Sequence, residues 1–243
     1  IKSKVQKIMI GILGGMGTHA GIDFCNKLAM LNHGKIDQKQ PLFILFNKSN
    51  IPARTENLKN YNKVLKSLMR GCQLLKKNNC KFIAMPCNTA HHWYNDIQKK
   101  IKIPIINMPK EVFNYCKKNM KKNSKIGILA TQGTLKTKIY DQFFDKNFIL
   151  IRPKYNYQTK NVDKAISLVK KGKISQAKNI IKPAIKFLLD KGCKKIILGC
   201  TELPLVIEKN KFSNKFLDSN LILAKASMKK YLRKKKEKFQ KEL

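Results

Sequence analysis

Arginine and acidic residues are scarce in this chain of 243 residues, which has four Arg and 14 Asp plus Glu against 48 Lys. The resulting net charge of +38 and the sequence pI of about 10.1 make a nucleic acid the first partner to consider. Arg, however, is the side chain best suited to bidentate contacts with phosphates and bases. Lys, Asn and Ile, which share A/T-rich codons, are abundant together. We therefore interpret the charge as Lys on solvated faces and expect no nucleic-acid partner.

Long apolar runs, export signals and paired cysteines are also missing. No apolar run approaches the roughly 18 residues of a membrane span, and the basic, then apolar N-terminus leads into a glycine turn without a cleavage site. The seven Cys form no CxxC pair, and the adjacent His91 and His92 would diverge on a helix. The sequence therefore predicts a globular protein with reduced thiols in the cytoplasm, without a membrane segment, disulfides or a metal site.

Short apolar runs alternate with stretches of helical periodicity, as is typical of α/β proteins with parallel sheets. The predicted strands are Lys7–Leu13, Leu42–Phe46, Phe82–Met85, Ile103–Ile106, Lys125–Leu129, Phe148–Ile151 and Lys195–Leu198. The predicted helices are Ala20–Asn32, Asn57–Lys77, Ala90–Lys100, Lys110–Lys118, Leu135–Asp145, Val162–Lys170, Ile174–Asp190 and Leu221–Lys236. The expected fold class is therefore α/β, with mostly parallel sheets flanked by helices.

The chain also repeats itself at a nearly constant distance. Ile10–Thr18 aligns without gaps to Ile126–Thr134 with six of nine positions identical, at an offset of 116 residues. Cys80–Cys87 aligns to Cys193–Cys200 at an offset of 113 residues. We therefore expect two similar domains related by a pseudo-twofold axis. The first comprises 1–108 together with 211–243, the second comprises 109–210, and the active site lies in the cleft between them.

Cys87 and Cys200 follow equivalent strands, and ligand sites of open α/β sheets lie beyond the carboxyl ends of the strands. Asn88 and Thr89 after the first, and Thr201 after the second, favour helix N-termini, whose partial positive charge stabilises a thiolate. Two such thiols across one cleft suit the transfer of a proton from one face of a carbon acid to the other. We interpret the remaining five Cys as buried structural residues.

An enolate-like intermediate of that reaction would need hydrogen-bond donors placed around its carboxylate. Backbone N–H groups of the turns, together with Asn88, Thr89, Thr131 and Thr201, are the candidates. A dinucleotide fingerprint at Gly15–Ala20 is a rival interpretation of the first Gly-rich turn. It needs a carboxylate at the end of the next strand to bind the ribose, and that strand ends without one.

Five motifs in order carry a resemblance: Ile12–Gly17, Ile51–Thr55, Met85–Trp93, Ala130–Thr134 and Leu198–Pro204. With them the sequence resembles the pyridoxal-phosphate-independent aspartate/glutamate racemase superfamily. The resemblance implies that Cys87 and Cys200 are the paired catalytic acid/bases and that no cofactor is used. It also implies two similar α/β domains with the active site between them, commonly assembled as a homodimer.

Within that superfamily the sequence looks like the aspartate racemase branch. Gly14–Gly15 stands where glutamate racemases characteristically carry Asp-Ser, and Glu202 stands where they carry His. The resemblance implies that Arg54 binds the substrate carboxylate and that Lys170 is a second basic residue of the site. An Arg fork suits bidentate binding of a carboxylate.

The predicted activity is a cofactor-independent amino acid racemase, most similar to aspartate or aspartate/glutamate racemases, that interconverts L and D isomers by a two-base mechanism. Thr18 replaces a usual Pro and Ala53 replaces a common Asp, which leaves room for a broader range of substrates. The alternatives are a maleate isomerase-like or hydantoin racemase-like enzyme of the same scaffold, or a basic nucleic-acid-binding protein. The expected substrate-binding residues are Met16, Arg54, Asn88, Thr89, Thr131, Thr134, Lys170, Thr201 and Glu202.

Overall fold

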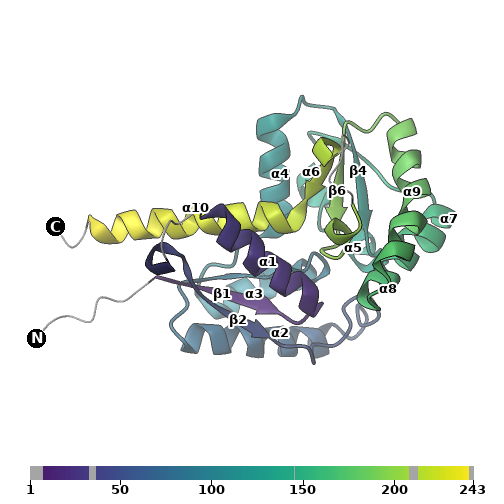
Figure 1. The fold of residues 1–243 in the computed structure, drawn as a ribbon. Coiled ribbons are helices and arrows are strands. Elements are labelled where there is room, and N and C mark those ends of the chain that lie inside the picture. Colours follow the sequence, from purple (N-terminus) through teal and green to yellow (C-terminus); the bar gives the residue numbers. More distant parts are fainter. Residues whose placement is uncertain (1–7, 33–36, 145, 208–212, 241–243) are drawn as a thin grey trace, which may run out of the picture.

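The computed structural model describes residues 8–32, 37–144, 146–207 and 213–240, and it contains two parallel sheets (Figure 1). The strand order is β2-β1-β3 in the first sheet and β5-β4-β6-β7 in the second. The strands are β1 Met9–Gly14, β2 Leu42–Asn47, β3 Phe82–Ala84, β4 Lys125–Ala130, β5 Ile149–Ile151, β6 Lys195–Gly199 and β7 Phe216–Asp218. The predicted α/β class, with parallel sheets flanked by helices, is confirmed.

The helices fill the connections between the strands. They are α1 Thr18–Leu31, α2 Tyr61–Lys77, α3 Tyr94–Ile101, α4 Met108–Asn119, α5 Gln132–Lys136, α6 Asp141–Phe144, α7 Tyr155–Tyr157, α8 Lys164–Lys170, α9 Ile174–Asp190 and α10 Ser219–Phe239. Short 3-10 turns lie at Asp37–Lys39, Thr89–Trp93, Leu203–Leu205 and Ser213–Lys215, and a π turn lies at Gln158–Asp163. None of the helices in the described ranges is long and apolar enough to cross a membrane.

The two halves repeat one arrangement of strands. β1 lies between β2 and β3, and β4 lies in the same way between β5 and β6. The registers correspond, because Ile10 pairs with Phe82 in the first half and Ile126 pairs with Lys195 in the second. The repeat in the sequence is therefore a repeat in the structure, and it places the carboxyl ends of β3 and β6 in equivalent positions.

Apolar residues on both faces of each sheet pack against helices. On the first sheet, α1 and α10 cover one face through Phe24 and Leu223, while α2 and α3 cover the other through Leu68 and Ile97. Regular spacing on α2 explains this packing, because four of its apolar residues recur every three or four positions and are buried. On the second sheet, α8 and α9 cover one face and α4 and α6 the other.

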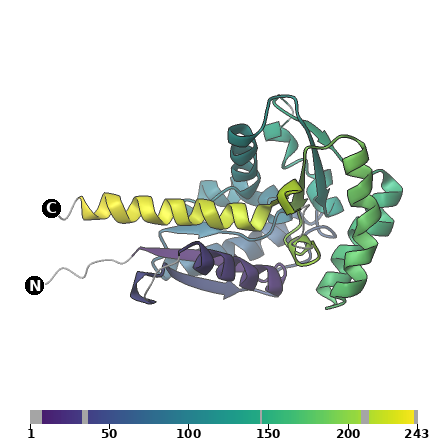
Figure 2. The same cartoon turned by 45° about the horizontal axis from the view of Figure 1, so that its top comes forward.

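The C-terminal helix α10 joins the two halves. Asp218 at the end of β7 caps it by accepting the backbone N–H groups of Asn220 and Leu221, and its carboxylate pairs with Lys27 of α1 at 2.7 Å. Strand β7 falls in the 211–243 segment that we expected in the first domain, yet it pairs with β6 of the second sheet. α10 then lies along α1, and its far end projects beyond the rest of the described chain (Figure 2).

Two predicted elements differ markedly from the structure, and one strand was not predicted. The expected strand Ile103–Ile106 is reduced to one bridge between Ile83 and Ile105, because Pro104 has no N–H for a ladder. The expected helix Leu135–Asp145 is divided into α5 and α6 by Lys138, whose φ is +51°. The strand β7 was not predicted, since three residues carry too little pattern. The predicted strand start Lys7 and helix end Asp145 lie outside the described residues.

Candidate active site

A cavity of about 70 Å³ lies between the two halves, beside the turns that follow β1, β3, β4 and β6. Such a volume holds about five water molecules or one small polar molecule. Its lining comprises Met16, Ala53, Arg54, Thr55, Glu56, Cys87, Asn88, Thr89, Thr131, Lys170, Gly199, Cys200, Thr201 and Glu202. The structure therefore brings together all of the predicted site residues except Thr134, which lies directly behind this lining.

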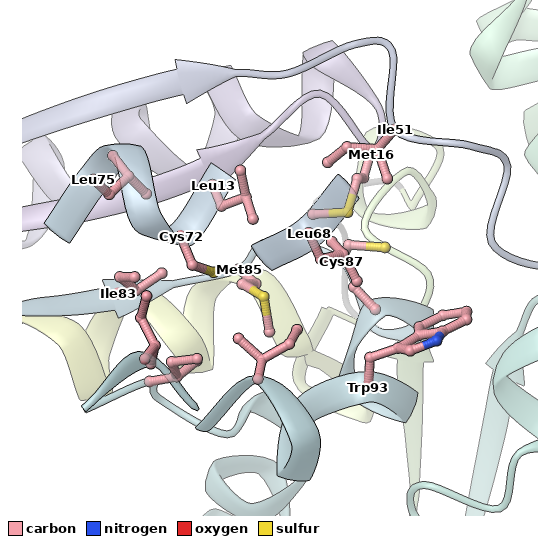
Figure 3. Close-up of a cluster of buried hydrophobic side chains, with 14 of the residues drawn as sticks. Leu13, Met16, Ile51, Leu68, Cys72, Leu75, Ile83, Met85, Cys87 and Trp93 are labelled. Carbon is pink, nitrogen blue, oxygen red and sulfur yellow. The ribbon is translucent and has the colours of Figure 1, made fainter. Parts of the chain in front are cut away.

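Cys87 is buried at the end of the apolar cluster of the first half, and its side chain lies there beside Met16 and Ile51 (Figure 3). The backbone carbonyl of Cys87 lies 2.9 Å from His91 Nδ1, and His91 Nε2 accepts the N–H of Met108 at 3.1 Å. Because Nε2 accepts, Nδ1 carries the proton and donates a hydrogen bond to the backbone carbonyl of Cys87. Burial lowers the pKa of His91, which keeps this imidazole neutral. His91 therefore ties the Cys87 turn to the start of α4.

Cys200 follows β6 directly and has a carboxylate as its partner. Its Sγ donates a hydrogen bond to Glu202 Oε2 at 2.9 Å. Burial, followed by the negative charge of Glu202, raises the pKa of Cys200 well above its ordinary value, while the positive charge of Lys170 lowers it. In neutral solution Cys200 is therefore held as a thiol.

The expected helix N-terminus is present after Cys87, where the 3-10 turn Thr89–Trp93 runs directly into α3. After Cys200 it is reduced to the single 3-10 turn Leu203–Leu205. The expected stabilisation of a thiolate is wrong for Cys200, because the pKa of this thiol is raised. Asn88 precedes the first turn without a side-chain cap bond, because its amide is engaged elsewhere. The charges that shift the pKa of Cys200 are those of Glu202 and Lys170.

Glu202 reaches Cys200 through a gap left by a glycine. A Cβ on Gly17 would lie 2.8 Å from Glu202 Oε1, closer than real Cβ contacts allow. Glu202 Oε1 is itself buried and has no hydrogen-bond partner within the described ranges. Gly17 belongs to the first Gly-rich turn and Glu202 to the second cysteine turn, so this close approach brings the two halves together at Cys200.

Arg54 lies on the loop after β2 and is held by backbone carbonyls. Its guanidinium donates to Met16 O at 2.6 Å and, over longer distances, to Ile51 O and Pro52 O. Its buried Nε has no hydrogen-bond partner among the residues described. Arg54 therefore presents a fixed positive charge to the cavity beside Met16, while the exposed Lys170 contributes a second one from the end of α8.

Three threonine hydroxyls form a triangle that joins the halves. Thr89 Oγ1 lies 3.0 Å from Thr131 Oγ1 and 2.9 Å from Thr134 Oγ1, and the last two are 3.2 Å apart. Thr131 also caps α5 by accepting the N–H of Thr134. Thr201 follows β6 in the second half, and its hydroxyl donates to the carbonyl of Pro86 in the first half at 3.4 Å. The hydroxyls of the predicted site are therefore held largely by one another and by backbone groups.

Three lining residues were not predicted: Thr55, Glu56 and Gly199. Adjacency was the available signal, because the first two follow Arg54 in sequence and Gly199 precedes Cys200. Ala53, which we expected to affect the range of substrates, also lines the cavity. Glu56 matters most, because it and Glu202 together balance the positive charges of Arg54 and Lys170 in the lining. Tyr140 and Ser219, which bind the Asn88 amide, were also missed, and no local signal marks them.

Comparison with known proteins places this chain in a family. The model of the Asp/Glu/hydantoin racemase family matches residues 13–227. The broad specificity amino-acid racemase RacX of Bacillus subtilis is 26% identical over 231 residues, which cover 92% of this chain and 98% of RacX.

Solved structures agree with that assignment. An aspartate racemase from Picrophilus torridus superposes with a TM-score of 0.82 and 29% identity, covering 92% of this chain and 94% of its own. A glutamate racemase from Francisella tularensis in complex with D-glutamate has the same fold, with a TM-score of 0.72 and 20% identity over 95% of this chain and 83% of its own. The chain is thus a member of the Asp/Glu/hydantoin racemase family, whose members are isomerases.

Proposed function

We propose that the protein racemises an acidic amino acid, aspartate first, by a cofactor-independent two-base mechanism with Cys87 and Cys200. One observation carries the proposal: two buried thiols from equivalent turns of the two halves line the same small cavity. The other five Cys do not line this cavity, so the pairing is specific to these two.

In the proposed reaction, one thiolate removes the α-hydrogen of the substrate as a proton. The electron pair left on the α-carbon is delocalised into the α-carboxylate. The opposite thiol then gives its proton to the other face of that carbon, which yields the opposite isomer. The thiol and the thiolate have exchanged roles at the end, so a reverse turnover restores the starting form.

The two thiols do not start as equals. Cys200 rests protonated, because burial and Glu202 raise its pKa. Cys87 has no such carboxylate bonded to its sulfur in the described structure. We therefore assign Cys87 as the base for the isomer whose α-hydrogen faces it and Cys200 as the proton donor in that direction.

Negative charge that develops on the substrate carboxylate needs donors already in place. Asn88, Thr89, Thr131 and Thr201 lie in the cavity wall with their side chains held by other hydrogen bonds. Because these groups are already ordered, little reorganisation is needed when the charge forms. We assign them the binding of the substrate carboxylate and of the intermediate, for which Thr201 turns its hydroxyl proton away from the long bond to Pro86 O. Thr134 holds the Thr89 and Thr131 hydroxyls from behind.

The charges of the lining favour a zwitterion with an acidic side chain. Arg54 and Lys170 offer two cations for two carboxylates, and Glu56 and Glu202 offer anions for an ammonium group. The 29% identity to an aspartate racemase supports aspartate as the first choice. The similarity to a broad specificity racemase supports testing glutamate and neutral amino acids as well.

The oligomeric state, the cellular location and the partners of the protein are part of the same proposal. We propose a cytoplasmic homodimer that needs no cofactor and uses no nucleic-acid partner. We also propose two structural units, 1–108 together with α10 and 109–210 together with β7. Size-exclusion chromatography with light scattering measures the mass of the assembly. An active protein that is a monomer in solution would contradict the proposed homodimer.

The test is a chiral substrate panel in D₂O without added pyridoxal phosphate. Purified protein is incubated with L-aspartate, L-glutamate and neutral amino acids, and α-hydrogen exchange and the D isomer are measured by NMR and chiral chromatography. We expect exchange and racemisation of aspartate above the other substrates. Failure of every substrate in the panel would refute the proposed function.

Single variants test the two-thiol mechanism separately. We expect Cys87→Ala and Cys200→Ala to lose racemisation by about a thousandfold or more, because each removes one of two obligatory proton carriers. Cys193→Ala is the matched control, since this buried Cys belongs to the repeated motif but lies outside the cavity. Full activity in either cavity variant would reject the mechanism while leaving racemase activity itself intact.

A further inference from the structure

A line of buried hydrogen bonds runs from Tyr140 to β6, the strand that precedes Cys200. Tyr140 OH lies 2.5 Å from Asn88 Oδ1, Asn88 Nδ2 lies 3.0 Å from Ser219 Oγ, and Ser219 Oγ lies 2.7 Å from Leu198 O. The exposed fractions of the three side chains are 1%, 2% and 0% in that order. The proposed mechanism gives no role to Tyr140 or Ser219.

The direction of every donor in this line follows from its last member. The Leu198 carbonyl can only accept, so the Ser219 hydroxyl donates to it. Ser219 then accepts from the Asn88 amide nitrogen, which turns the amide oxygen toward Tyr140. The Tyr140 hydroxyl therefore donates to Asn88 Oδ1. Only one rotamer of the Asn88 amide satisfies all three bonds.

This orientation has a consequence for the cavity. Asn88 follows Cys87 directly and lines the cavity. One N–H of its amide is used by Ser219, and the described residues supply no partner for the other. With its oxygen bonded to Tyr140, the amide offers the cavity a donor, and donation to that oxygen polarises the free N–H further.

Tyr140 also connects the two halves, because it belongs to the second half and its hydroxyl binds Asn88 of the first. It packs in the apolar cluster of the second half with Phe144 and Val112, where a Phe would fill the same space. Its hydroxyl is the one part that a Phe lacks, and a buried hydroxyl is costly unless it is bonded. The Asn88 turn is therefore fixed to the half that contains Cys200.

We propose that Tyr140 is a positioning residue for racemisation, which acts by holding the Asn88 carboxamide as a donor toward the substrate carboxylate. This inference rests on the proposed function of the cavity. Ser219 completes the arrangement by fixing the same amide to β6, two residues before Cys200.

A double-mutant cycle tests the assignment through kcat and KM on the best substrate of the panel. We expect Tyr140→Phe to lower kcat about tenfold with KM nearly unchanged, and Asn88→Ala to lower kcat about a hundredfold, as for loss of a donor to a developing anion. If Tyr140 acts through Asn88, the double variant is no slower than Asn88→Ala alone. A merely structural contribution of Tyr140 would multiply the two effects.

The controls separate the possible failures. Tyr94→Phe removes a half-buried hydroxyl of the first half, outside the cavity, and should keep the wild-type kcat. Ser219→Ala approaches the amide from its other end and should show the same coupling to Asn88→Ala. Thermal unfolding confirms that each variant is folded.

Multiplicative effects in the cycle of Tyr140→Phe with Asn88→Ala, or a wild-type kcat in Tyr140→Phe, overturn the inference, while an active wild-type protein preserves the proposed function. A wild-type protein that racemises nothing overturns both. If Tyr140→Phe does not fold, the cycle of Ser219→Ala with Asn88→Ala decides.

Discussion

Replacing Glu202 with Gln removes the negative charge beside Cys200 and keeps the shape of the side chain. Glu202 Oε2 lies 2.9 Å from Cys200 Sγ, and both residues are buried. Two unit charges about 4 Å apart interact by about 1 kcal/mol in water and by about 4 kcal/mol at the effective dielectric constant of a protein site. Removing this repulsion should therefore favour the Cys200 thiolate by about 1–4 kcal/mol.

The pKa of Cys200 is expected to change in the direction opposite to the shift that Glu202 now causes. The carboxylate raises the pKa of Cys200, so Glu202→Gln should lower that pKa. Burial remains in the variant and keeps the pKa above its ordinary value. The fraction of Cys200 present as thiolate at neutral pH should therefore increase.

Ultraviolet absorbance of the thiolate during a pH titration measures this change. The titration is made in a Cys87→Ala background, and the signal of the same protein with Cys200→Ala is subtracted to isolate Cys200. Lys170→Met is the matched control of opposite sign, because Lys170 lowers the pKa of Cys200 and its loss should raise it. An unchanged or higher pKa in Glu202→Gln would refute the electrostatic reasoning.

Three further changes test other parts of the structure. Gly17→Ala should lower kcat at least about tenfold with little change in melting temperature, since its φ of −89° suits Ala but the new Cβ would displace Glu202 Oε1; a normal kcat would contradict this. Arg54→Met should raise the KM for aspartate at least about tenfold through loss of a carboxylate partner, with an unchanged KM as the contrary result. Leu68→Ala should lower the free energy of unfolding by about 2–5 kcal/mol in urea titrations, because Leu68 is fully buried, and a loss below about 1 kcal/mol would contradict the close packing of its side chain.

Much of the fold was predictable because its information is local. Apolar runs bounded by turn residues mark β1, β2, β4 and β6, and three- to four-residue spacing marks α2 and α9. The prediction was wrong where local pattern and tertiary context differ. Pro104 reduced a predicted strand to one bridge, and a left-handed Lys138 divided a predicted helix.

The contents of the cavity were predictable for a related reason. The chain duplicates a strand and the turn after it, and parallel strands place such turns at one edge of a sheet. Cys87 and Cys200 therefore come to one cavity, with the polar residues that follow them in sequence. Thr55 and Glu56 were missed although they adjoin Arg54, because their own types carry no distinctive pattern.

The sequence by itself determined the α/β class, the internal repeat and the pairing of two cysteines at equivalent strand ends. Each of these depends on neighbours along the chain or on a repeat within it. Only the tertiary structure decided that Asn88 binds Tyr140 and Ser219, which lie 52 and 131 residues away, rather than capping its own turn. It also decided that the two thiols differ, because the pKa of Cys200 depends on burial and on charges that folding brings within reach.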